Sequence, residues 1–281
     1  MTKAIVITGA SGLVGKELVR YFSEKGYEVR ALVRNPKAFS NTKNVSYYPY
    51  DLAKKVDGTP FKNADYLVHT AYTKSGENVL KQNVDAAKSL LKISRANKLK
   101  RNVFISSMSA DENAPGAYGR QKYQIEQLFT GKNDTVIRSG LVIGEGGLAH
   151  QIIDFMSTKH VAPLIDGGKQ PIQFIAIQDL AKVIDTIIEK GIGGQLYIGT
   201  PRIYTYKEFY QTVKKKKQIK ALLLPVPYFI PLLAIRLIRL LRLPLAVTED
   251  NLKGLRNLKA YDTKDDVKKV GVTLQELEEM L

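Results

Sequence analysis

Two side chains of the 281-residue sequence, those of Tyr118 and Lys122, have types and spacing suited to proton transfer. Residues four positions apart share one face of a helix. A lysine ammonium group beside a tyrosine hydroxyl favours the phenolate and lowers the pKa of the tyrosine. Such a tyrosine can exchange a proton with a substrate oxygen while a hydride passes to or from a nicotinamide. The pair therefore indicates acid–base chemistry at a carbonyl or carbinol group.

The position of this pair is more informative than its spacing. The pattern Tyr-x-x-x-Lys occurs four times in the chain, at Tyr21/Lys25, Tyr50/Lys54, Tyr118/Lys122 and Tyr210/Lys214. Only Tyr118 follows an apolar strand pattern that ends in serines, in the stretch FISSMS. Ligands of doubly wound sheets lie at the carboxyl ends of the strands. We therefore expect Ser106, Ser107 or Ser109 either to hydrogen-bond the reacting oxygen or simply to cap the strand.

Three glycines near the N-terminus predict a site for a phosphate-bearing ligand. Gly9, Gly12 and Gly15 follow the apolar run AIVIT and precede an amphipathic stretch. Glycines at such a junction permit a tight turn, a close approach of the backbone to a pyrophosphate, and close packing of a helix on the sheet. The helix N-terminus adds free N–H groups and a partial positive charge. The spacing, GxxGxxG, predicts a dinucleotide site, with a plain glycine-rich turn as the alternative.

The second apolar run, VRALVRNP, bears on which dinucleotide binds. At the end of the second strand, a carboxylate hydrogen-bonds the ribose 2′-hydroxyl of NAD, whereas an arginine accommodates the 2′-phosphate of NADP. This run has Arg30 and Arg34 and no carboxylate. The sequence therefore favours NADP(H) bound through Arg34, with NAD(H) as the alternative cofactor. The alternative interpretation of Arg34 is a solvated surface side chain.

Apolar runs of strand length alternate with helical patterns along the chain. Strands are expected at Ala4–Ile7, Glu28–Val33, Val45–Tyr48, Tyr66–His69, Asn102–Ser106, Thr135–Arg138, Gln173–Ile177 and Gln195–Ile198. Helices are expected at Leu13–Glu24, Val79–Ala96, Tyr118–Phe129, Asp179–Lys190 and Thr205–Lys217. Parallel neighbours need crossover connections, and right-handed crossovers place helices on both faces. The alternation therefore predicts an α/β fold with a doubly wound parallel sheet.

Composition narrows the function classes. The net charge of +16 favours anionic ligands such as nucleotides, phosphates, nucleic acid or an acidic membrane surface. The sequence contains no zinc finger or basic recognition helix, so we expect no nucleic-acid partner. It has no cysteine, and its three histidines are scattered, so we expect no disulfide and no metal site. No charged and apolar leader opens the chain, so a cytoplasmic location is expected.

At these motifs the chain resembles the short-chain dehydrogenase/reductase superfamily, in its extended or atypical (epimerase/dehydratase-like) branches. TGASGLVG resembles the TGxxGxxG of that family, YGRQKYQIEQLF resembles its YxxxK helix, and KRNVFISS resembles the strand that carries the active-site serine. YDL and HTA resemble its segments beside the adenine and after the fourth strand. The resemblance implies a Rossmann domain in residues 1–155, to which residues 172–200 return. Residues 156–171 and 201–281 would then form a small C-terminal substrate lobe.

The resemblance also implies residue roles. Tyr118 would be the acid/base, Lys122 would lower its pKa and hold the nicotinamide ribose, and Ser107 would orient the substrate oxygen. The residues implied to bind the cofactor are Gly9, Ser11, Gly12, Leu13, Val14, Gly15, Arg34, Asp51, Leu52, Thr70, Ala71, Tyr118 and Lys122. The family pattern allows a monomer, or a homodimer formed through residues 78–97 and 117–130.

Two departures from the family pattern bear on the reaction. Only ten residues separate Ser107 from Tyr118, and the C-terminal lobe is short, so a nucleotide-sugar substrate is disfavoured. We therefore expect an NAD(P)-dependent oxidoreductase acting on a small anionic or lipophilic molecule. One alternative is a nucleotide-sugar epimerase or dehydratase with tightly held NAD. The other is a non-enzymatic dinucleotide sensor or membrane-docked accessory protein, although the retained tyrosine favours an enzyme.

The segment KKKKQIKALLLPVPYFIPLLAIRLIRLLRLPL differs in composition from the rest of the chain. Its uncharged part, residues 221–235, is too short and too interrupted by prolines to span a bilayer. Arg236, Arg239 and Arg242 step by three along an otherwise apolar run. Residues 214–243 are therefore expected either to lie on an anionic membrane surface or to form a lobe helix whose apolar face packs on the core.

Overall fold

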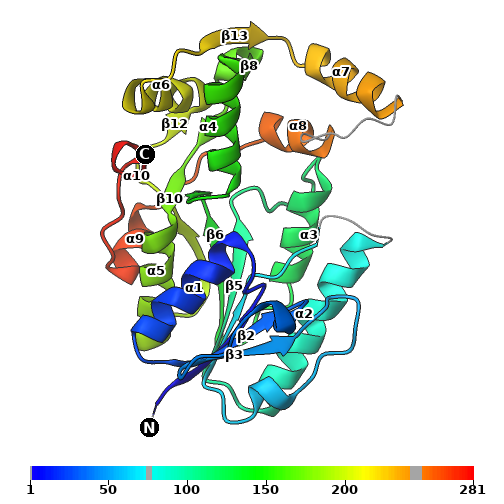
Figure 1. The fold of residues 1–281 in the computed structure, drawn as a ribbon, viewed down its shortest axis with the longest axis vertical. Helices are drawn as coiled ribbons and strands as arrows, with labels where there is room; N and C mark the ends of the chain where they lie inside the picture. The colour runs from blue at the N-terminus through cyan, green and yellow to red at the C-terminus, as the bar shows by residue number, and fades with distance from the viewer. Residues whose placement is uncertain (1, 74–77, 241–248) are drawn as a thin grey trace.

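The computed structural model describes residues 2–73, 78–240 and 249–281. A seven-stranded parallel sheet lies at its centre (Figure 1). The strands are β1 (Ala4–Thr8), β2 (Glu28–Val33), β3 (Val45–Pro49), β4 (Tyr66–His69), β5 (Arg101–Ser107), β6 (Asp134–Ser139) and β11 (Gly194–Ile198). Their spatial order is β11-β6-β5-β4-β1-β2-β3. The order reverses between β1 and β4, because the chain builds outward to β3 and then crosses back to begin β4 on the other side of β1.

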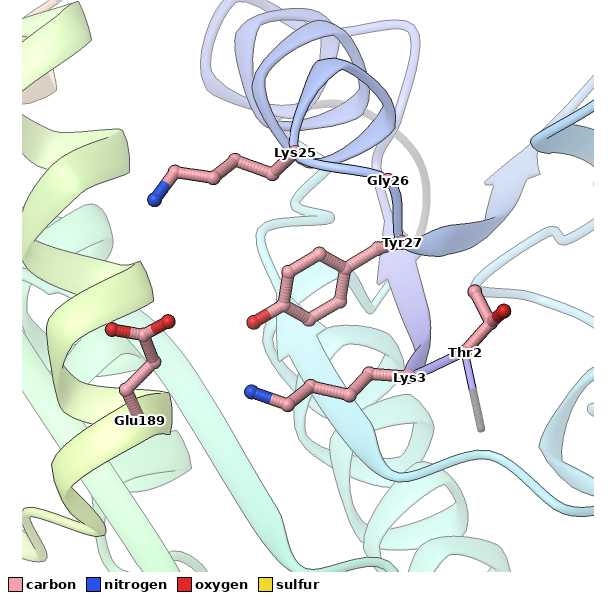
Figure 2. Close-up of a pocket in the computed structure, with 6 residues that line it drawn as sticks. All are labelled: Thr2, Lys3, Lys25, Gly26, Tyr27 and Glu189. Carbon is pink, nitrogen blue, oxygen red and sulfur yellow. The ribbon is translucent and has the colours of Figure 1, made fainter.

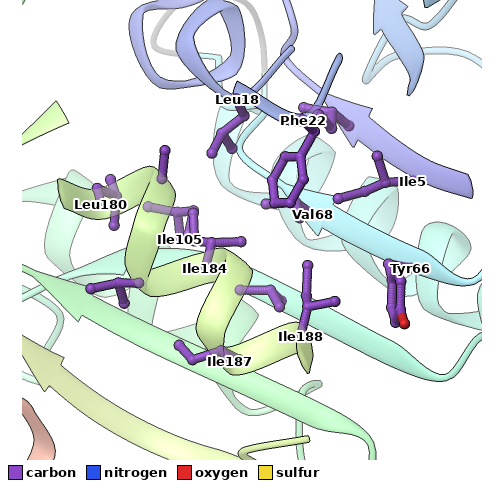
Figure 3. Packing of buried hydrophobic residues seen from close by; sticks show 14 of the residues in the cluster. Ile5, Leu18, Phe22, Tyr66, Val68, Ile105, Leu180, Ile184, Ile187 and Ile188 are labelled. Carbon is purple, nitrogen blue, oxygen red and sulfur yellow. The ribbon is translucent and has the colours of Figure 1, made fainter. Parts of the chain in front are cut away.

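Helices cover both faces of this sheet, which confirms the predicted doubly wound fold. α1 (Leu13–Glu24) and α5 (Ile177–Lys190) pack together on one face, and α2 (Val79–Ala96) and α3 (Ala117–Glu126) pack together on the other. The side chains of β5 alternate accordingly. Val103 and Ile105 join the core beneath α1 and α5, whereas Phe104 joins the core beneath α2 and α3. In Figure 3, Phe22 of α1 and Ile184 of α5 meet over the strands.

A second hydrophobic core lies at the opposite end of the molecule from the N-terminus (Figure 1). It contains Phe174, Tyr204 and Phe209, all fully buried. The elements around it are β7 (Leu141–Ile143), α4 (Leu148–Lys159), β8 (Val161–Ile165), β9 (Pro171–Ile172), β10 (Phe174–Ala176), β12 (Tyr204–Thr205), α6 (Tyr206–Lys217), β13 (Leu222–Val226) and α10 (Leu277–Met280).

Three further helices follow β13. They are α7 (Phe229–Leu240), α8 (Glu249–Arg256) and α9 (Lys264–Val270). α7 packs against α8, and α9 packs against β11 and α5, where Val270 joins the core of the sheet. The predicted division into residues 1–155 with 172–200 and residues 156–171 with 201–281 stays a prediction.

The observed elements follow the predicted ones closely in the first half of the chain, where α1, β2, β4 and α2 have the predicted bounds. The helix expected to reach Phe129 ends at Glu126. The strand expected at Gln173–Ile177 is shorter, because Ile177 already begins α5. In the tail, Arg236 is exposed on α7, and Arg242 lies outside the described residues.

Candidate active site

The residues predicted to do chemistry meet at the carboxyl ends of β1, β4 and β5. Thr8, His69 and Ser107 are the last residues of these three neighbouring strands. The reversal of strand order between β1 and β4 falls here, and open α/β sheets bind ligands at such a switch point.

The turn between β1 and α1 requires glycine at two positions. Gly9 has φ +66°, and a Cβ there would lie 2.7 Å from Thr70 Oγ1 and 2.8 Å from the Ala71 Cα. A Cβ on Gly15 would overlap the carbonyl oxygen of Gly9 and lie 2.7 Å from the Ala10 Cα. The neighbouring atoms are mostly backbone, so they cannot move aside cheaply. Glycine therefore allows α1 and the end of β4 to pack directly on the turn.

The first turn of α1 fits a pyrophosphate. The helix begins after Gly12, which has no side chain to cap it, and its first turn contains no acidic residue. The N–H groups there and the helix dipole favour an anion. Ser11 is exposed, and Leu13 and Val14 are half-buried. These three residues, all implied to bind the cofactor, therefore lie together with Gly12 and Gly15 at the start of α1.

Thr8 ties β1 to β4 at the switch point. Its hydroxyl oxygen accepts hydrogen bonds from the backbone N–H groups of Thr70 and Ala71, both at 3.2 Å. It lies 2.7 Å from Nδ1 of His69, to which it must donate its one proton. Burial lowers the pKa of His69 to about 3, so the ring is neutral and stacks on Phe104. The implied cofactor residues Thr70 and Ala71 are thus fixed beside Gly9.

The structure distinguishes Arg30, which lies in β2, from Arg34, which follows it. Arg30 is occupied, because it pairs with Glu28 at 2.9 Å and donates to the backbone carbonyl of Pro60 at 2.9 Å. Arg34 directly follows β2 and is exposed. Asp51 and Leu52 follow β3 and are half-buried, with Asp51 accepting a hydrogen bond from the N–H of Ala53. Arg34 is therefore the arginine available to a ligand at this edge.

The structure also separates the three serines. Ser106 donates its hydroxyl proton to the buried carboxylate of Glu126. Ser107 shares a hydrogen bond of 2.9 Å with Ser109, and it is the one serine of the three whose side chain lowers the pKa of Tyr118. Of the three, Ser107 is therefore the one that acts on the tyrosine.

Tyr118 is half-buried at the start of α3. Desolvation raises the pKa of its hydroxyl, and the hydrogen bond with Ser107 opposes that rise. The ring of Tyr72 packs edge-on against that of Tyr118, with centroids 5.2 Å apart. Tyr72 was not singled out from the sequence, because it belongs to no residue pattern of its own and only follows HTA.

Lys122 is buried behind Tyr118. Its ammonium group donates to the carbonyl of Ile105 at 2.7 Å and lies 4.7 Å from the centre of the Phe104 ring. It is 5.8 Å from the centre of the Tyr118 ring. Burial lowers the pKa of Lys122 to about 8. The spacing predicted a tyrosine with a lowered pKa, but the pKa of Tyr118 is raised here, because desolvation dominates and the ammonium group is held by the Ile105 carbonyl.

The far end of α3 is anchored to β6 by a buried ion pair. Arg138 donates to both carboxylate oxygens of Glu126, and its other arm donates to the Tyr197 hydroxyl at 2.8 Å. A buried charge is tolerated when it is paired and hydrogen-bonded in this way. The pair fixes the helix that carries Tyr118 and Lys122.

The near end of α3 is capped from a distant part of the chain. Its N-cap residue, Gly116, has no side chain, and Asp250 of α8 supplies the missing acceptor. Oδ1 of Asp250 accepts from the N–H of Ala117, and Oδ2 accepts from the N–H of Tyr118 at 3.3 Å. Sequence reasoning missed Asp250 because 132 positions separate it from Tyr118 and no local pattern marks it.

A polar hollow lies outside this site, at the amino-terminal ends of the strands. It is lined by Thr2, Lys3, Lys25, Gly26, Tyr27 and Glu189, near the amino ends of β1 and β2 (Figure 2). Lys25 pairs with Asp185 of α5 at 3.0 Å. The hollow therefore faces the edge opposite to the glycine turn.

Comparisons with known proteins agree with this fold. The model of a family described as the NAD dependent epimerase/dehydratase family matches residues 5–199. The chain is 25% identical over 225 residues to the 4-hydroxy-2-methyl-3-oxo-4-farnesyl-3,4-dihydroquinoline-1-oxide ketoreductase of Stigmatella aurantiaca, covering 69% of this chain and 67% of that protein. It is 30% identical over 125 residues to Cinnamoyl-CoA reductase 2 of Arabidopsis thaliana, covering 38% and 36% of the two chains.

A structural likeness extends over the whole chain. The solved structure of MoeE5 in complex with UDP-glucuronic acid and NAD has a TM-score of 0.74 and 17% identity, covering 99% of this chain and 96% of that one. At this identity the likeness shows the fold alone. The match spans 67% of the length of the Stigmatella ketoreductase and 36% of the length of Cinnamoyl-CoA reductase 2.

The cap that Asp250 of α8 provides predicts a local effect on α3. Asp250→Ala removes the acceptor of the Ala117 and Tyr118 amides, so their hydrogen exchange should accelerate about fivefold or more, the equivalent of a lost N-cap. Asp250→Asn keeps one acceptor oxygen, so exchange at one of the two amides should change much less than in Asp250→Ala. The control is Asp265→Ala, which removes an exposed aspartate from the first turn of α9. Unchanged exchange at both amides in Asp250→Ala would show that the cap does not hold the helix.

Lys122 predicts a pH-dependent stability. Its pKa falls from 10.5 to about 8 on folding, so between these values the unfolded chain binds more protons, and the free energy of unfolding rises with pH. Lys122→Met removes this titration. Between about pH 8 and pH 9.5, urea unfolding should show the wild type gaining about 1.5 kcal/mol relative to that variant. Lys268→Met, at an exposed position of α9, should instead track the wild type. Parallel pH curves for the wild type and Lys122→Met would contradict the assignment.

Proposed function

We propose that this chain, which belongs to the NAD dependent epimerase/dehydratase family, is an NAD(P)-dependent oxidoreductase that interconverts a carbonyl and a carbinol. The observation that carries the proposal is the position of Tyr118. It stands in the first turn of α3, near Ser107 at the end of β5, at the carboxyl edge of the sheet and next to the strands that flank the switch point.

The residues around the glycine turn fit a nicotinamide dinucleotide. The N–H groups of the first turn of α1 would hold its pyrophosphate, close to Gly9 and Gly12. Arg34 would hold a 2′-phosphate, which favours NADP(H), and Asp51 and Leu52 would flank the adenine. When bound, the dinucleotide supplies or accepts a hydride.

Tyr118 would move the proton of the reaction. Because its pKa is raised, its hydroxyl is protonated at neutral pH and can donate to a carbonyl oxygen during reduction. Ser107 would hydrogen-bond the same oxygen and fix its position. In the oxidation direction, the tyrosine would take the proton back from the carbinol. Tyr72, packed edge-on against Tyr118, would shield this exchange from water.

The ketoreductase and reductase names of the two relatives favour carbonyl reduction, and the first acts on a farnesylated substrate by its name. A lipophilic carbonyl compound is therefore the substrate class we propose. The family description supports a second candidate, a nucleotide-sugar epimerase or dehydratase. The two differ in how the cofactor is held, since an epimerase regenerates its NAD in every cycle and has no need to release it.

Tyr118→Phe tests the acid–base role. This variant should bind NADPH normally and lose about 10²- to 10⁴-fold in turnover, because only the proton donor is removed. Turnover is followed as NADPH oxidation with a panel of aromatic ketones, aldehydes and quinones. Tyr123→Phe is the matched control, since Tyr123 is also half-buried on α3. Full activity in Tyr118→Phe would refute the mechanism.

Arg34→Ala tests the cofactor preference. Loss of a charge-assisted contact to the 2′-phosphate should weaken NADPH binding roughly 10- to 100-fold while NADH binding stays nearly constant. Lys62→Ala, at an exposed cation before β4, should change neither affinity. An unchanged affinity ratio would overturn the NADP(H) assignment. Stoichiometric NAD retained through gel filtration would instead favour the epimerase.

A further inference from the structure

The end of the molecule farthest from the N-terminus exposes an apolar surface. In Figure 1, α6, β13 and α7 follow one another across this end, with β13 between the two helices. Leu222 of β13 is 63% exposed, and Phe229 and Leu233 of α7 are 65% and 67% exposed. Leu224 and Ile230 are exposed beside them. We name these five residues the α7 face.

The two elements carrying these side chains are already packed on their inner sides. Leu223 of β13 packs into the second core, whereas its neighbours in sequence point outward. On α7, Leu232 and Ile235 pack near Leu252 of α8. β13 and α7 thus each bury one apolar side against the rest of the protein and expose a second apolar side to solvent. Folding of the described chain does not account for it.

A group of cations lies just before β13, the strand that leads to α7. The last turn of α6 carries Lys215, Lys216 and Lys217, all exposed, and Lys220 lies exposed just before β13. In the described parts of the chain, no ion pair involves any of these four lysines. Four unpaired cations at one end of β13, with exposed leucines along the strand and an exposed phenylalanine beyond its other end, match a membrane surface, which is anionic at the headgroups and apolar beneath them.

Other occupants fit less well. Pro225 interrupts the exposed strand β13 and has no N–H, so strand addition by another chain is disfavoured. A nucleic acid would neutralise the lysines but leave the apolar side chains in water. No helix of the described residues is long and apolar enough to cross a bilayer, so the chemistry is that of an interface.

We propose that the α7 face docks on the surface of a membrane containing anionic lipids. Phe229 and Leu233, one helical turn apart on α7, enter the boundary between headgroups and acyl chains. The lysines at the end of α6 meet the lipid phosphates. α7 packs against α8, whose Asp250 caps the helix bearing Tyr118, so the docked face is one helix away from the candidate active site.

The test is flotation of the full-length protein with vesicles. One set contains phosphatidylglycerol and phosphatidylcholine, and the other contains phosphatidylcholine alone. The protein should float with the anionic vesicles at low salt, float poorly with the neutral ones, and be partly released by high salt.

Two variant pairs separate the contributions. Lys216→Gln/Lys217→Gln should weaken binding to anionic vesicles roughly tenfold or more. Its control, Lys268→Gln/Lys269→Gln, removes two exposed cations from the last turn of another helix, α9, and should bind like the wild type. Leu233→Ser should also weaken binding, whereas Leu80→Ser, at an exposed leucine of α2, should not. All six positions are exposed, so folding should be retained, as thermal unfolding will show.

Three results would overturn the proposal. The first is equal flotation with neutral vesicles or none with either kind. The second is equal loss in each variant and its control, which would mean diffuse charge attraction. The third is a dimer in light scattering that Leu233→Ser dissociates, with no effect of that variant on vesicle binding, which would assign the face to a second copy of the chain.

Discussion

The candidate site depends on the close packing of the turn between β1 and α1 against the segment that follows β4. Thr8 accepts hydrogen bonds from two backbone N–H groups of the segment after β4 and donates a hydrogen bond to the neutral ring of His69. Because Gly9 has no side chain, the turn and the segment after β4 pack in direct contact. This contact holds the glycine turn and the start of α1 in one arrangement at the switch point, and every proposed cofactor contact of the turn is positioned by it.

Tyr118 is positioned by a helix that is fixed at both ends. At one end, the buried pair of Glu126 and Arg138 anchors α3 to β6. At the other, Asp250 caps it from α8. The first anchor belongs to the sheet, and the second belongs to the C-terminal part of the chain. A change in the C-terminal elements can therefore reach the tyrosine without any contact with the substrate.

The sequence was informative where local rules decide the outcome. The bounds of α1, β2, β4 and α2 follow from periodicity and from the residues that end each run, and the glycine turn lies where its spacing predicted. The sequence did not allow contacts between residues far apart in the chain to be predicted. No pattern predicts that Asp250 caps α3, that Ser106 is held by Glu126, or that Arg30 is occupied by backbone carbonyls. The raised pKa of Tyr118 was also not predictable, because the i, i+4 spacing indicates proximity of Lys122 but not which acceptor its ammonium group chooses.

The central claim is that a dinucleotide lies across the carboxyl edge at the switch point with its nicotinamide beside Tyr118. A crystal structure of the protein grown with NADP(H) tests this most directly. The account predicts pyrophosphate density on the N–H groups of the first turn of α1 and a nicotinamide ring facing the hydroxyl of Tyr118. Density in the polar hollow around Lys25, or a nicotinamide turned away from Tyr118, would contradict it.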